Sequence, residues 1–337
     1  MNTPTVIGTG YLTLDVIIKG TEKTPYKVQA GGSFGNVLTI LSYLGANSFP
    51  IARLDDNRVS DYILSDLKFW GVHLNLIFKE ENGSTPVLIH RILTSRDGSP
   101  RHKFEFKNPI NGIKFPSFRP FLSGNIDSIL SDIPKSDVYY FDRVNRSAIT
   151  LAKEAKKNGC LVFFEPSSNS YSKIFEECLS VADVVKFSND RLPEYKEKYI
   201  SSRCALEIET KGAKGLSYRY QNGEWQSLDP ILIDHAIDTV GAGDWCSSGI
   251  IYKLSQFNSI QSIESHELTN ALNYGQMLGA INCLFIGARG AMYKLDSTFF
   301  STLDYSKIYT DKEEIDKMYH HKSDFINTES NILEWIS

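Results

Sequence analysis

Residues 238–244, Asp-Thr-Val-Gly-Ala-Gly-Asp, combine glycines and carboxylates in a spacing suited to phosphoryl transfer. They follow the apolar run 231–237 and precede residues with helical spacing, so we predict a strand-to-helix turn. Glycines at a helix start leave N–H groups unobstructed, and these donors attract an anion together with the helix dipole. Asp244 falls in the first helical turn, where a carboxylate can take the proton of a hydroxyl that attacks a phosphoryl group. The alternative is that Asp244 only complements the helix dipole.

The elements that position this turn are predicted from about residue 136 onward. Short apolar runs alternate there with helix-like segments, including a polar helix expected from about Asp190, and this alternation is typical of a parallel sheet covered by helices. Ligands of such sheets bind at the carboxyl ends of the strands. Either the polar residues at those ends face one crevice or they are ordinary loop residues. They are Asp142, Arg143, Glu165, Ser188 and Thr210.

Two other stretches, at about 12–29 and 85–107, are rich in strand-forming residues. We expect them to pair into a small β-layer that forms a lid over the crevice. Apolar residues in the second stretch, such as Val87, Ile89 and Ile92, suit coverage by a second subunit, so a homodimer is expected. The polar stretch 297–337 is predicted to be a helical appendage.

The segment 238–244 resembles the C-terminal signature of the ribokinase family, the PfkB-type carbohydrate kinases, and further motifs match from about residue 5 to 295. The resemblance implies a ribokinase-like α/β fold over residues 1–296. That fold has three α/β/α layers, a mainly parallel central sheet and a small β-sheet lid. The resemblance also implies that Asp244 is the catalytic base, and that the backbone of Gly241, Ala242 and Gly243 forms the anion hole.

The same resemblance implies an acceptor site near the N-terminus. Asp15 matches the substrate-binding aspartate, Gly31 and Gly32 let a sugar approach the backbone, and Asn36 bonds a hydroxyl. Independently of the family, two glycines before a helical run with an asparagine one turn later suit a polyol-binding corner. Asp142 and Arg143 are further candidates for binding the substrate.

Residues 209–215 are similar to the family's T-x-G-x-x-G, which lies along the nucleotide phosphates. Without the resemblance, an ordinary glycine turn into a hairpin around residues 222–223 would be the better interpretation. The implied cofactors are ATP and Mg²⁺, with Glu165 acting on Mg²⁺ through water, and K⁺ held by Asp238 and the carbonyl of Val240. The implied nucleotide-binding residues are Thr210, Gly212, Gly215, Ser188, Gln276 and Gly287.

The chain departs from the family pattern at residues 188–191. The usual N-x-x-E is Ser-Asn-Asp-Arg here, so Arg191 stands where a carboxylate is expected. Asp190 or Glu194 would then take over its role toward Mg²⁺, or metal handling differs. Trp245 replaces the small residue that commonly follows the catalytic aspartate, and these changes indicate a divergent member.

The leading hypothesis is ATP-dependent phosphorylation of a primary hydroxyl of a sugar or sugar-like molecule. A nucleoside acceptor is an alternative, because Phe104, Phe106 and Phe115 offer rings for stacking on a base. A ligand-binding relative that has lost catalysis is a third hypothesis, motivated by Arg191. Dinucleotide binding at residues 8–10 is rejected because Thr13 replaces the third glycine and no helix pattern follows.

The charge and cysteine content of the chain limit the classes of binding partner and the compartments that we expect. The 337 residues include 36 Lys and Arg against 40 Asp and Glu, with a net charge of −4. Because no basic block is present, nucleic acid is excluded as an expected partner. Five cysteines without a C-x-x-C pair and an N-terminus without signal-peptide features predict a cytoplasmic location. The apolar run 271–288 is interrupted by Asn273, Gln276 and Asn282, so it predicts a buried helix rather than a membrane span.

Overall fold

The computed structural model describes residues 3–95, 100–167, 171–233, 235–303 and 331–336. Its main sheet has eight strands in the order β14-β13-β12-β11-β10-β9-β1-β4, parallel from β4 to β12 and antiparallel at β13 and β14. The expected mainly parallel α/β sheet is therefore confirmed. The strands of the main sheet are β1 (Thr5–Thr9), β4 (Asn47–Pro50), β9 (Val138–Phe141), β10 (Leu161–Phe164), β11 (Val184–Ser188), β12 (Leu206–Thr210), β13 (Leu216–Tyr220) and β14 (Gln226–Leu228).

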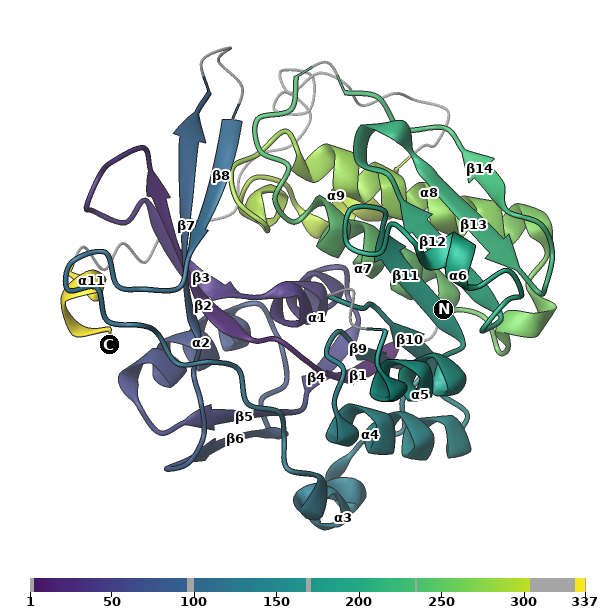
Figure 1. Ribbon diagram of the computed structural model, residues 1–337, viewed down its shortest axis with the longest axis horizontal. Coiled ribbons are helices and arrows are strands. Elements are labelled where there is room, and N and C mark those ends of the chain that lie inside the picture. The colour runs from purple at the N-terminus through teal and green to yellow at the C-terminus, as the bar shows by residue number, and fades with distance from the viewer. Residues whose placement is uncertain (1–2, 96–99, 168–170, 234, 304–330, 337) are drawn as a thin grey trace.

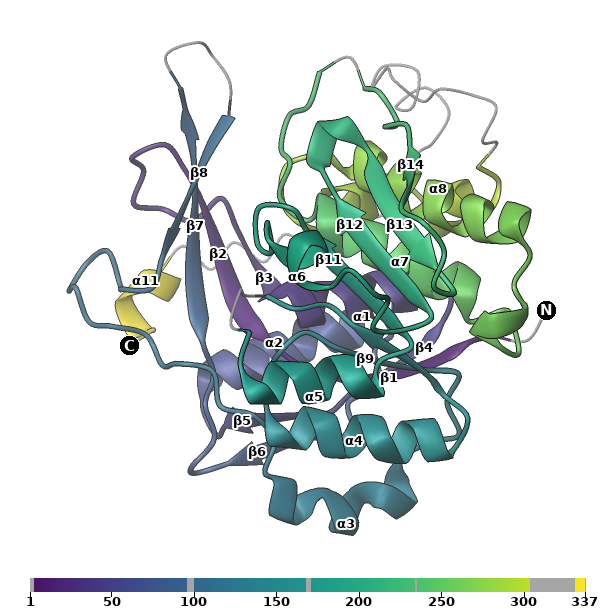
Figure 2. The same ribbon diagram turned by 45° about the vertical axis from the view of Figure 1, so that its right-hand side comes forward.

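Helices cover both faces of the main sheet, which gives the three expected layers (Figures 1 and 2). Helices α4 and α5 pack on one face, and α1, α7 and α8 on the other. The α-helices are α1 (Ser33–Tyr43), α2 (Arg58–Phe69), α3 (Ile126–Ile129), α4 (Arg146–Lys157), α5 (Lys173–Val181), α6 (Tyr195–Lys198), α7 (Ala242–Leu254), α8 (Ser265–Asn282), α9 (Ser297–Ser301) and α11 (Ile332–Trp335). Short 3₁₀ turns lie at Ser123–Asn125, Leu130–Asp132, Gly212–Lys214, Ile260–Ser262 and Gly290–Tyr293.

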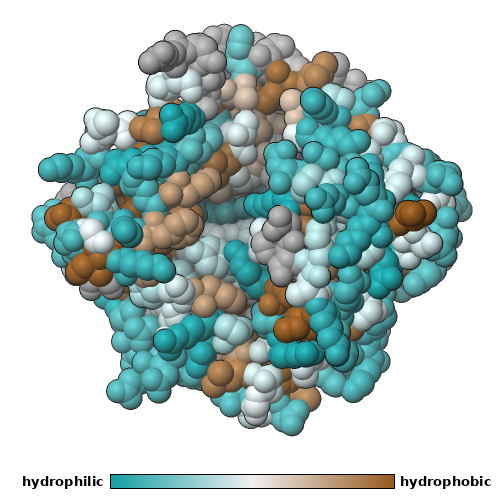
Figure 3. Space-filling view, viewed as in Figure 1, coloured by the Kyte–Doolittle hydropathy of each residue, from teal (hydrophilic) through white to brown (hydrophobic). Residues whose placement is uncertain are grey.

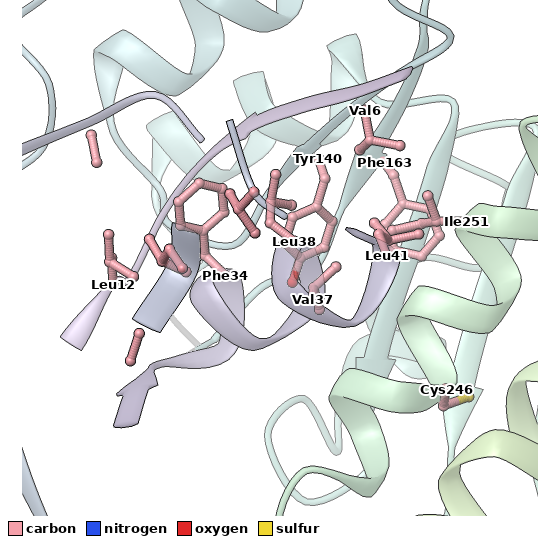
Figure 4. Close-up of a cluster of buried hydrophobic side chains, with 14 of the residues drawn as sticks. Val6, Leu12, Phe34, Val37, Leu38, Leu41, Tyr140, Phe163, Cys246 and Ile251 are labelled. Atoms are coloured by element: carbon pink, nitrogen blue, oxygen red, sulfur yellow. The ribbon is translucent and has the colours of Figure 1, made fainter. Parts of the chain in front are cut away.

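The strands are buried on both sides, so neighbouring residues along a strand belong to different cores. In β9, Tyr140 packs with Phe34 of α1 and Phe163 of β10, while the next residue, Phe141, joins the core under α4 and α5. Figure 4 shows the first of these clusters, in which α1 lies against the sheet. This double core fixes α1 and α7 at the carboxyl ends of the strands.

A separate four-stranded sheet, here called the lid sheet, has the order β3-β2-β7-β8 (Figure 1). Both strand-rich stretches contribute a strand pair, as expected, and β2 runs parallel to β7. Val87 and Ile89 are buried in the core of the same chain, so the expectation that they form an exposed apolar face is wrong. The lid strands are β2 (Thr13–Lys19), β3 (Lys27–Gly31), β7 (Val87–Thr94) and β8 (Pro100–Glu105), and a further pair is β5 (Ala52–Asp55) with β6 (Ile77–Glu80).

Residues 331–336 dock against the base of the lid sheet. Ile332 and Leu333 are buried in the core that Val87 and Ile89 also join. The amide Nδ2 of Asn108 donates to the carbonyl oxygens of Leu333 at 2.8 Å and of Ile336 at 2.7 Å. Of the rest of the appendage predicted over 297–337, residues 297–303 are described and begin with α9, whereas residues 304–330 and 337 lie outside the described residues.

Two local predictions are wrong. The polar helix expected from about Asp190 is a turn, because Pro193 lacks an N–H and disfavours helical backbone at Leu192, and α6 begins only at Tyr195. The segment before the glycine turn is no strand among the described residues 229–233 and 235–241. Instead, the N–H of Ile237 donates to the carbonyl of Cys283 at 2.7 Å, just past the end of α8.

No helix within the described ranges is both long and apolar enough to cross a membrane.

Candidate active site

A cavity of about 1150 Å³ lies between the lid sheet and the carboxyl ends of the main sheet. Figure 3 shows this hollow at the centre of the face seen in Figure 1. Residues from the lid, from α1, from the loops after β11 and β12, and from α7 and α8 line it. Most of the predicted site residues therefore lie around one space, as the position of ligand sites in open α/β sheets requires.

The turn before α7 forms the floor of the cavity. Gly241 is the N-cap with φ 82°, and a Cβ there would lie 2.2 Å from the carbonyl oxygen of Ala288, so only glycine fits. Nothing lies within 4 Å of a Cβ built on Gly243, which leaves that side of the turn open. Gly241, Ala242, Gly243 and Asp244 all line the cavity. The first N–H groups of a helix have no partner within it, so this turn can hold an anion.

Asp244 lies in the first turn of α7, and its Oδ2 accepts a hydrogen bond from Nδ2 of Asn36 at 2.8 Å. Burial of the carboxylate at the cavity floor and the nearby Glu165 charge raise the pKa of Asp244 to about 7, although the Asn36 bond, Arg191 and Lys186 oppose this. A carboxylate with this pKa can both accept and release a proton near neutral pH. A dipole partner alone would gain nothing from such a raised pKa.

Asp15 of β2 lies at the lid side of the cavity and is 8% exposed. Its Oδ1 accepts a hydrogen bond from Thr13 Oγ1 at 2.5 Å, and burial raises the pKa of Asp15 to about 6. A Cβ on Gly31 would lie 2.0 Å from the Asp15 carboxylate, so this glycine makes room for the aspartate. Gly31 itself does not line the cavity, whereas Gly32 does.

Two buried amide atoms of residues that line the cavity have no hydrogen-bond partner among the described residues. They are Nε2 of Gln29 and Oδ1 of Asn36, and both residues line the cavity. Buried polar groups are normally paired, so an unpaired donor and an unpaired acceptor beside one cavity indicate a polar ligand. Gln29 was not singled out from the sequence, because nothing distinguishes it from other polar residues of a strand.

Asp142 does not touch the cavity. Its carboxylate is fully buried and accepts hydrogen bonds from the N–H groups of Tyr11 and Phe34 and from Ser33 Oγ. It therefore fixes the start of α1 rather than contacting a ligand directly. Arg143 lines the cavity, pairs with Asp142 at 3.1 Å and lies over the Tyr11 ring.

A buried ion pair supports the glycine turn from below. Lys186 Nζ lies 2.8 Å from Glu165 Oε1 and also donates to the carbonyl of Gly243 at 3.2 Å. Tyr140 and Ser247 donate to the other Glu165 oxygen. Burial would raise the pKa of Glu165, but the Lys186 ammonium outweighs this effect and keeps that pKa below its usual value. The sequence offered one signal for Lys186, a single cation inside the apolar strand β11.

The opposite end of the cavity is formed by the loops after β11 and β12. Thr210, Gly212, Gly215 and Ser188 line it, as does Gln276 of α8. Gly215 has φ 81°, and a Cβ there would lie 2.3 Å from the carbonyl of Leu228. The 3₁₀ turn at residues 212–214 and the hairpin of β13 and β14 are both present, so the glycines serve a turn that also borders the cavity.

The turn after β11 carries exposed charges. Asp190 and Arg191 are exposed and line the cavity. Arg191 lies close enough to lower the pKa of both Asp244 and Glu165. Neighbouring Asn189 also lines the cavity, and its Nδ2 donates to Glu209 at 3.0 Å.

The predicted cation ligands lie behind the glycine turn. Asp238 is fully buried, and its carboxylate accepts from the N–H of Val240 at 2.9 Å and of Gly287 at 2.8 Å. Nε2 of His102, from the lid strand β8, lies 3.3 Å from Asp238 Oδ1. Gly287 thus joins a second loop to the glycine turn and does not border the cavity, whereas its neighbour Ala288 does.

The pfkB family carbohydrate kinase profile matches residues 10–294. The chain belongs to this family. The resemblance seen in the motifs is therefore confirmed at the level of the family. Probable fructokinase-5 of Arabidopsis thaliana is 23% identical over 317 residues, which cover 83% of this chain and 91% of that protein.

Solved structures share the fold of this pfkB family kinase. Aminoimidazole riboside kinase from Salmonella enterica, complexed with aminoimidazole riboside and an ATP analogue, has a TM-score of 0.65 at 19% identity, covering 88% of this chain and 99% of its own. A fructokinase double mutant from Vibrio cholerae, in a fructose-, ADP- and potassium-bound form, has a TM-score of 0.65 at 21% identity, with coverages of 86% and 95%.

Proposed function

We propose that this pfkB family kinase transfers the γ-phosphoryl group of ATP to a hydroxyl, in the first instance a primary alcohol, of a sugar or sugar-like molecule. The observation that carries the proposal is the position of Asp244. Its carboxylate lies on the cavity floor, hydrogen-bonded to Asn36, beside the N-terminus of α7 and with its pKa raised to about 7.

In the proposed reaction the acceptor oxygen attacks the γ-phosphorus while Asp244 takes the hydroxyl proton. The bond between the γ-phosphorus and the bridging oxygen breaks, and ADP leaves with that oxygen. The N–H groups at the start of α7 stabilise the charge on the transferred group, and little reorganisation is needed because the turn is already formed. Asn36 keeps the carboxylate aimed at the acceptor.

The buried Lys186–Glu165 pair would hold the turn in position, since Lys186 binds the carbonyl of Gly243 from behind. Arg191 would supply positive charge from the turn after β11, where the family usually has a carboxylate. An arginine stabilises a phosphoryl group through fixed N–H donors, which suits charge that develops during transfer.

Glu165, expected to act on Mg²⁺ through water, lines the cavity but is a poor candidate for contacting the ion directly. Lys186, Tyr140 and Ser247 already use its two oxygens, and it is 6% exposed. Asp190 fits better, because it is exposed and lines the cavity. Mg²⁺ keeps several waters and commonly needs only one or two carboxylates besides the nucleotide oxygens, so Asp190 would hold it with the phosphates of ATP. Bound there, Mg²⁺ would neutralise phosphate charge.

The acceptor end favours a molecule with several hydroxyls. Asp15 offers an acceptor, Gln29 an unused donor and Asn36 an unused acceptor within the cavity. A hydroxyl can donate and accept, so a polyol satisfies all three groups. Arg143 is already paired with Asp142, which leaves it a weak candidate for binding a second phosphate.

A nucleoside is the second candidate acceptor, and Phe104 favours it. Its ring lines the cavity on β8 and is 48% exposed. Phe106 does not line the cavity, and Phe115 is buried, so only Phe104 of the three rings singled out can stack on a base.

The test is an ATP-consumption screen with Mg²⁺ against sugars, polyols, sugar phosphates and nucleosides, run in parallel with Asp244→Asn. Turnover with one acceptor that disappears in the variant supports both the reaction and its base. Competition by adenosine or inosine, relieved by Phe104→Ala, would favour the nucleoside. Ligand-induced thermal stabilisation without ATP consumption by either protein would overturn the kinase assignment in favour of a binding protein.

A homodimer in a reducing compartment completes the proposal. Phe104 and Phe106 leave apolar surface at the edge of the lid sheet, and the five cysteines are free thiols. Light scattering after size exclusion would detect the dimer, and a monomer at all concentrations tested would contradict it.

A further inference from the structure

Behind the glycine turn that precedes α7, two loops meet around one fully buried asparagine. Asn282 is the last residue of α8, and its Nδ2 donates to the carbonyl oxygens of Val240 at 3.2 Å and Gly287 at 3.3 Å. Its Oδ1 accepts from the N–H of Ala291 at 3.1 Å. One amide side chain therefore links the loop of the glycine turn to the loop that follows α8.

Asp238 links the same two loops from its own side, through the N–H groups of Val240 and Gly287. At both Val240 and Gly287, the N–H donates to the Asp238 carboxylate and the carbonyl accepts from the Asn282 amide. The polar groups that face each other across the two loops thus satisfy one another without an added ligand.

The ribokinase resemblance implies a monovalent cation held by Asp238 and the Val240 carbonyl, and these residues do not fit it. Asn282 already uses one of the two lone pairs of each carbonyl oxygen, and a cation at its position would have to displace two formed, buried hydrogen bonds. His102 also lies within 3.3 Å of the carboxylate. The oxygens that would coordinate a cation, on the Asp238 carboxylate and the two carbonyls, therefore already accept hydrogen bonds from N–H groups.

We infer that the Asn282 amide takes the structural place of a monovalent cation in this chain, so that the catalytic turn needs no K⁺. Asn282 is a positioning residue. It holds Val240 next to Gly241, whose close packing against Ala288 sets the direction of the first N–H groups of α7. The partial positive charge of the amide Nδ2 substitutes for the ion, and the two loops are held by side chains of the protein itself, Asn282 and Asp238.

The test compares thermal unfolding midpoints and turnover in KCl and in choline chloride at equal concentration. Wild type is expected to show the same midpoint and the same turnover in both salts. Asn282→Asp places a carboxyl group against the carbonyls of Val240 and Gly287, so its ionised form is repelled unless a cation binds between them. For that variant K⁺ should raise both the midpoint and the turnover in a saturable manner.

Asn270→Asp is the charge-matched control, because Asn270 is an exposed asparagine on the same helix. It should behave as wild type in both salts. Asn282→Ala keeps the inference testable if the aspartate variant does not fold, since it leaves both carbonyls unpaired and should also gain stabilisation by K⁺.

Saturable stabilisation of wild type by K⁺, or loss of its turnover in choline chloride, would overturn the inference. The inference would also be overturned if Asn282 variants fold but show the same unfolding midpoint with and without K⁺. The inference rests on the proposed function for its kinetic readout only. If no acceptor is turned over, the unfolding midpoints still decide it, whereas the ATP-consumption screen decides the function.

Discussion

Two turns border the cavity, and they are built differently. The turn before α7 is fixed by backbone contacts, buried bonds and an ion pair, from Gly241 against Ala288 to Lys186 under Gly243. The turn after β11, with Asp190 and Arg191, presents exposed side chains. Substitution at the first turn disturbs packing and chemistry together. At the second turn an exposed side chain can be replaced without disturbing the packing of the fold. This explains why Arg191 can occupy a position where the family usually has a carboxylate.

Asp244→Asn should have the largest effect, a fall in kcat of about 10² to 10⁴-fold, because the amide cannot accept the hydroxyl proton. Initial rates with the best acceptor measure it, and an unchanged unfolding midpoint at pH 5 shows that the fold persists. A variant that keeps more than a tenth of the wild-type kcat would remove Asp244 from the role of base.

Lys186→Met tests the support beneath the first turn. It leaves the buried Glu165 charge without its partner and should lower the free energy of unfolding by about 3–5 kcal/mol. Urea unfolding measures the change. Lys156→Met is the control, because its ion pair with Asp183 is partly exposed and should contribute only about 0–1 kcal/mol. Equal losses in the two variants would mean that the buried pair has no special role.

Arg191→Ala tests the second turn and should lower kcat by about 10 to 10²-fold, with no comparable loss of stability. Arg191→Lys, which keeps the charge but loses the planar donor set, should fall between the alanine variant and wild type. If Arg191→Ala matched wild type in kcat and in ATP dependence, the exposed turn would contribute nothing to transfer.

The smallest effect is expected for Asn36→Ala, which should shift the pH dependence of kcat/KM. Because Asp244 must be deprotonated to act as a base, kcat/KM should rise with pH to a plateau above about 7. Asn36→Ala removes a bond that lowers the pKa of Asp244, so the midpoint should move to higher pH. An unmoved midpoint in pH–rate profiles would separate Asn36 from the base.

As pH rises, the contribution of Asp244 to the free energy of unfolding should fall, whereas kcat/KM should rise. The folded state holds the Asp244 proton to higher pH than the unfolded chain, so the contribution of this group to stability falls as pH rises from about 4 to about 7. Asp244→Asn should flatten that part of the stability curve. The Asp15 pKa, raised to about 6, leaves a residual slope of the same sign.

The sequence was most informative where backbone geometry restricts the residue. Gly241, Gly212 and Gly215 marked two turns of the cavity in the sequence, because each has a positive φ that few other residues adopt. The sheet and the lid pairing followed from alternating apolar runs. The strand expected at 231–237 is wrong, because an apolar run does not reveal that the N–H of Ile237 donates to Cys283, just past the end of α8.

Residues that act through buried partners were harder to find. Asn282 was noted only as a polar interruption of an apolar helix, and its role depends on two loops that meet there only in the folded chain. Gln29 and Lys186 are similar cases. Asp142 was placed at the correct strand end, but a sequence does not show that its oxygens bind the backbone of α1 instead of a ligand.

The bonds from Asn108 to Leu333 and Ile336 span 225 and 228 positions of the chain. Synthesis proceeds from the N-terminus at a finite rate, and earlier parts of a chain begin to fold first. The base of the lid sheet therefore lacks its apolar cover until residues 332–336 have left the ribosome. A nascent chain can pair the strands of the main sheet before that point, so the contacts at the base of the lid sheet can form only near the end of synthesis.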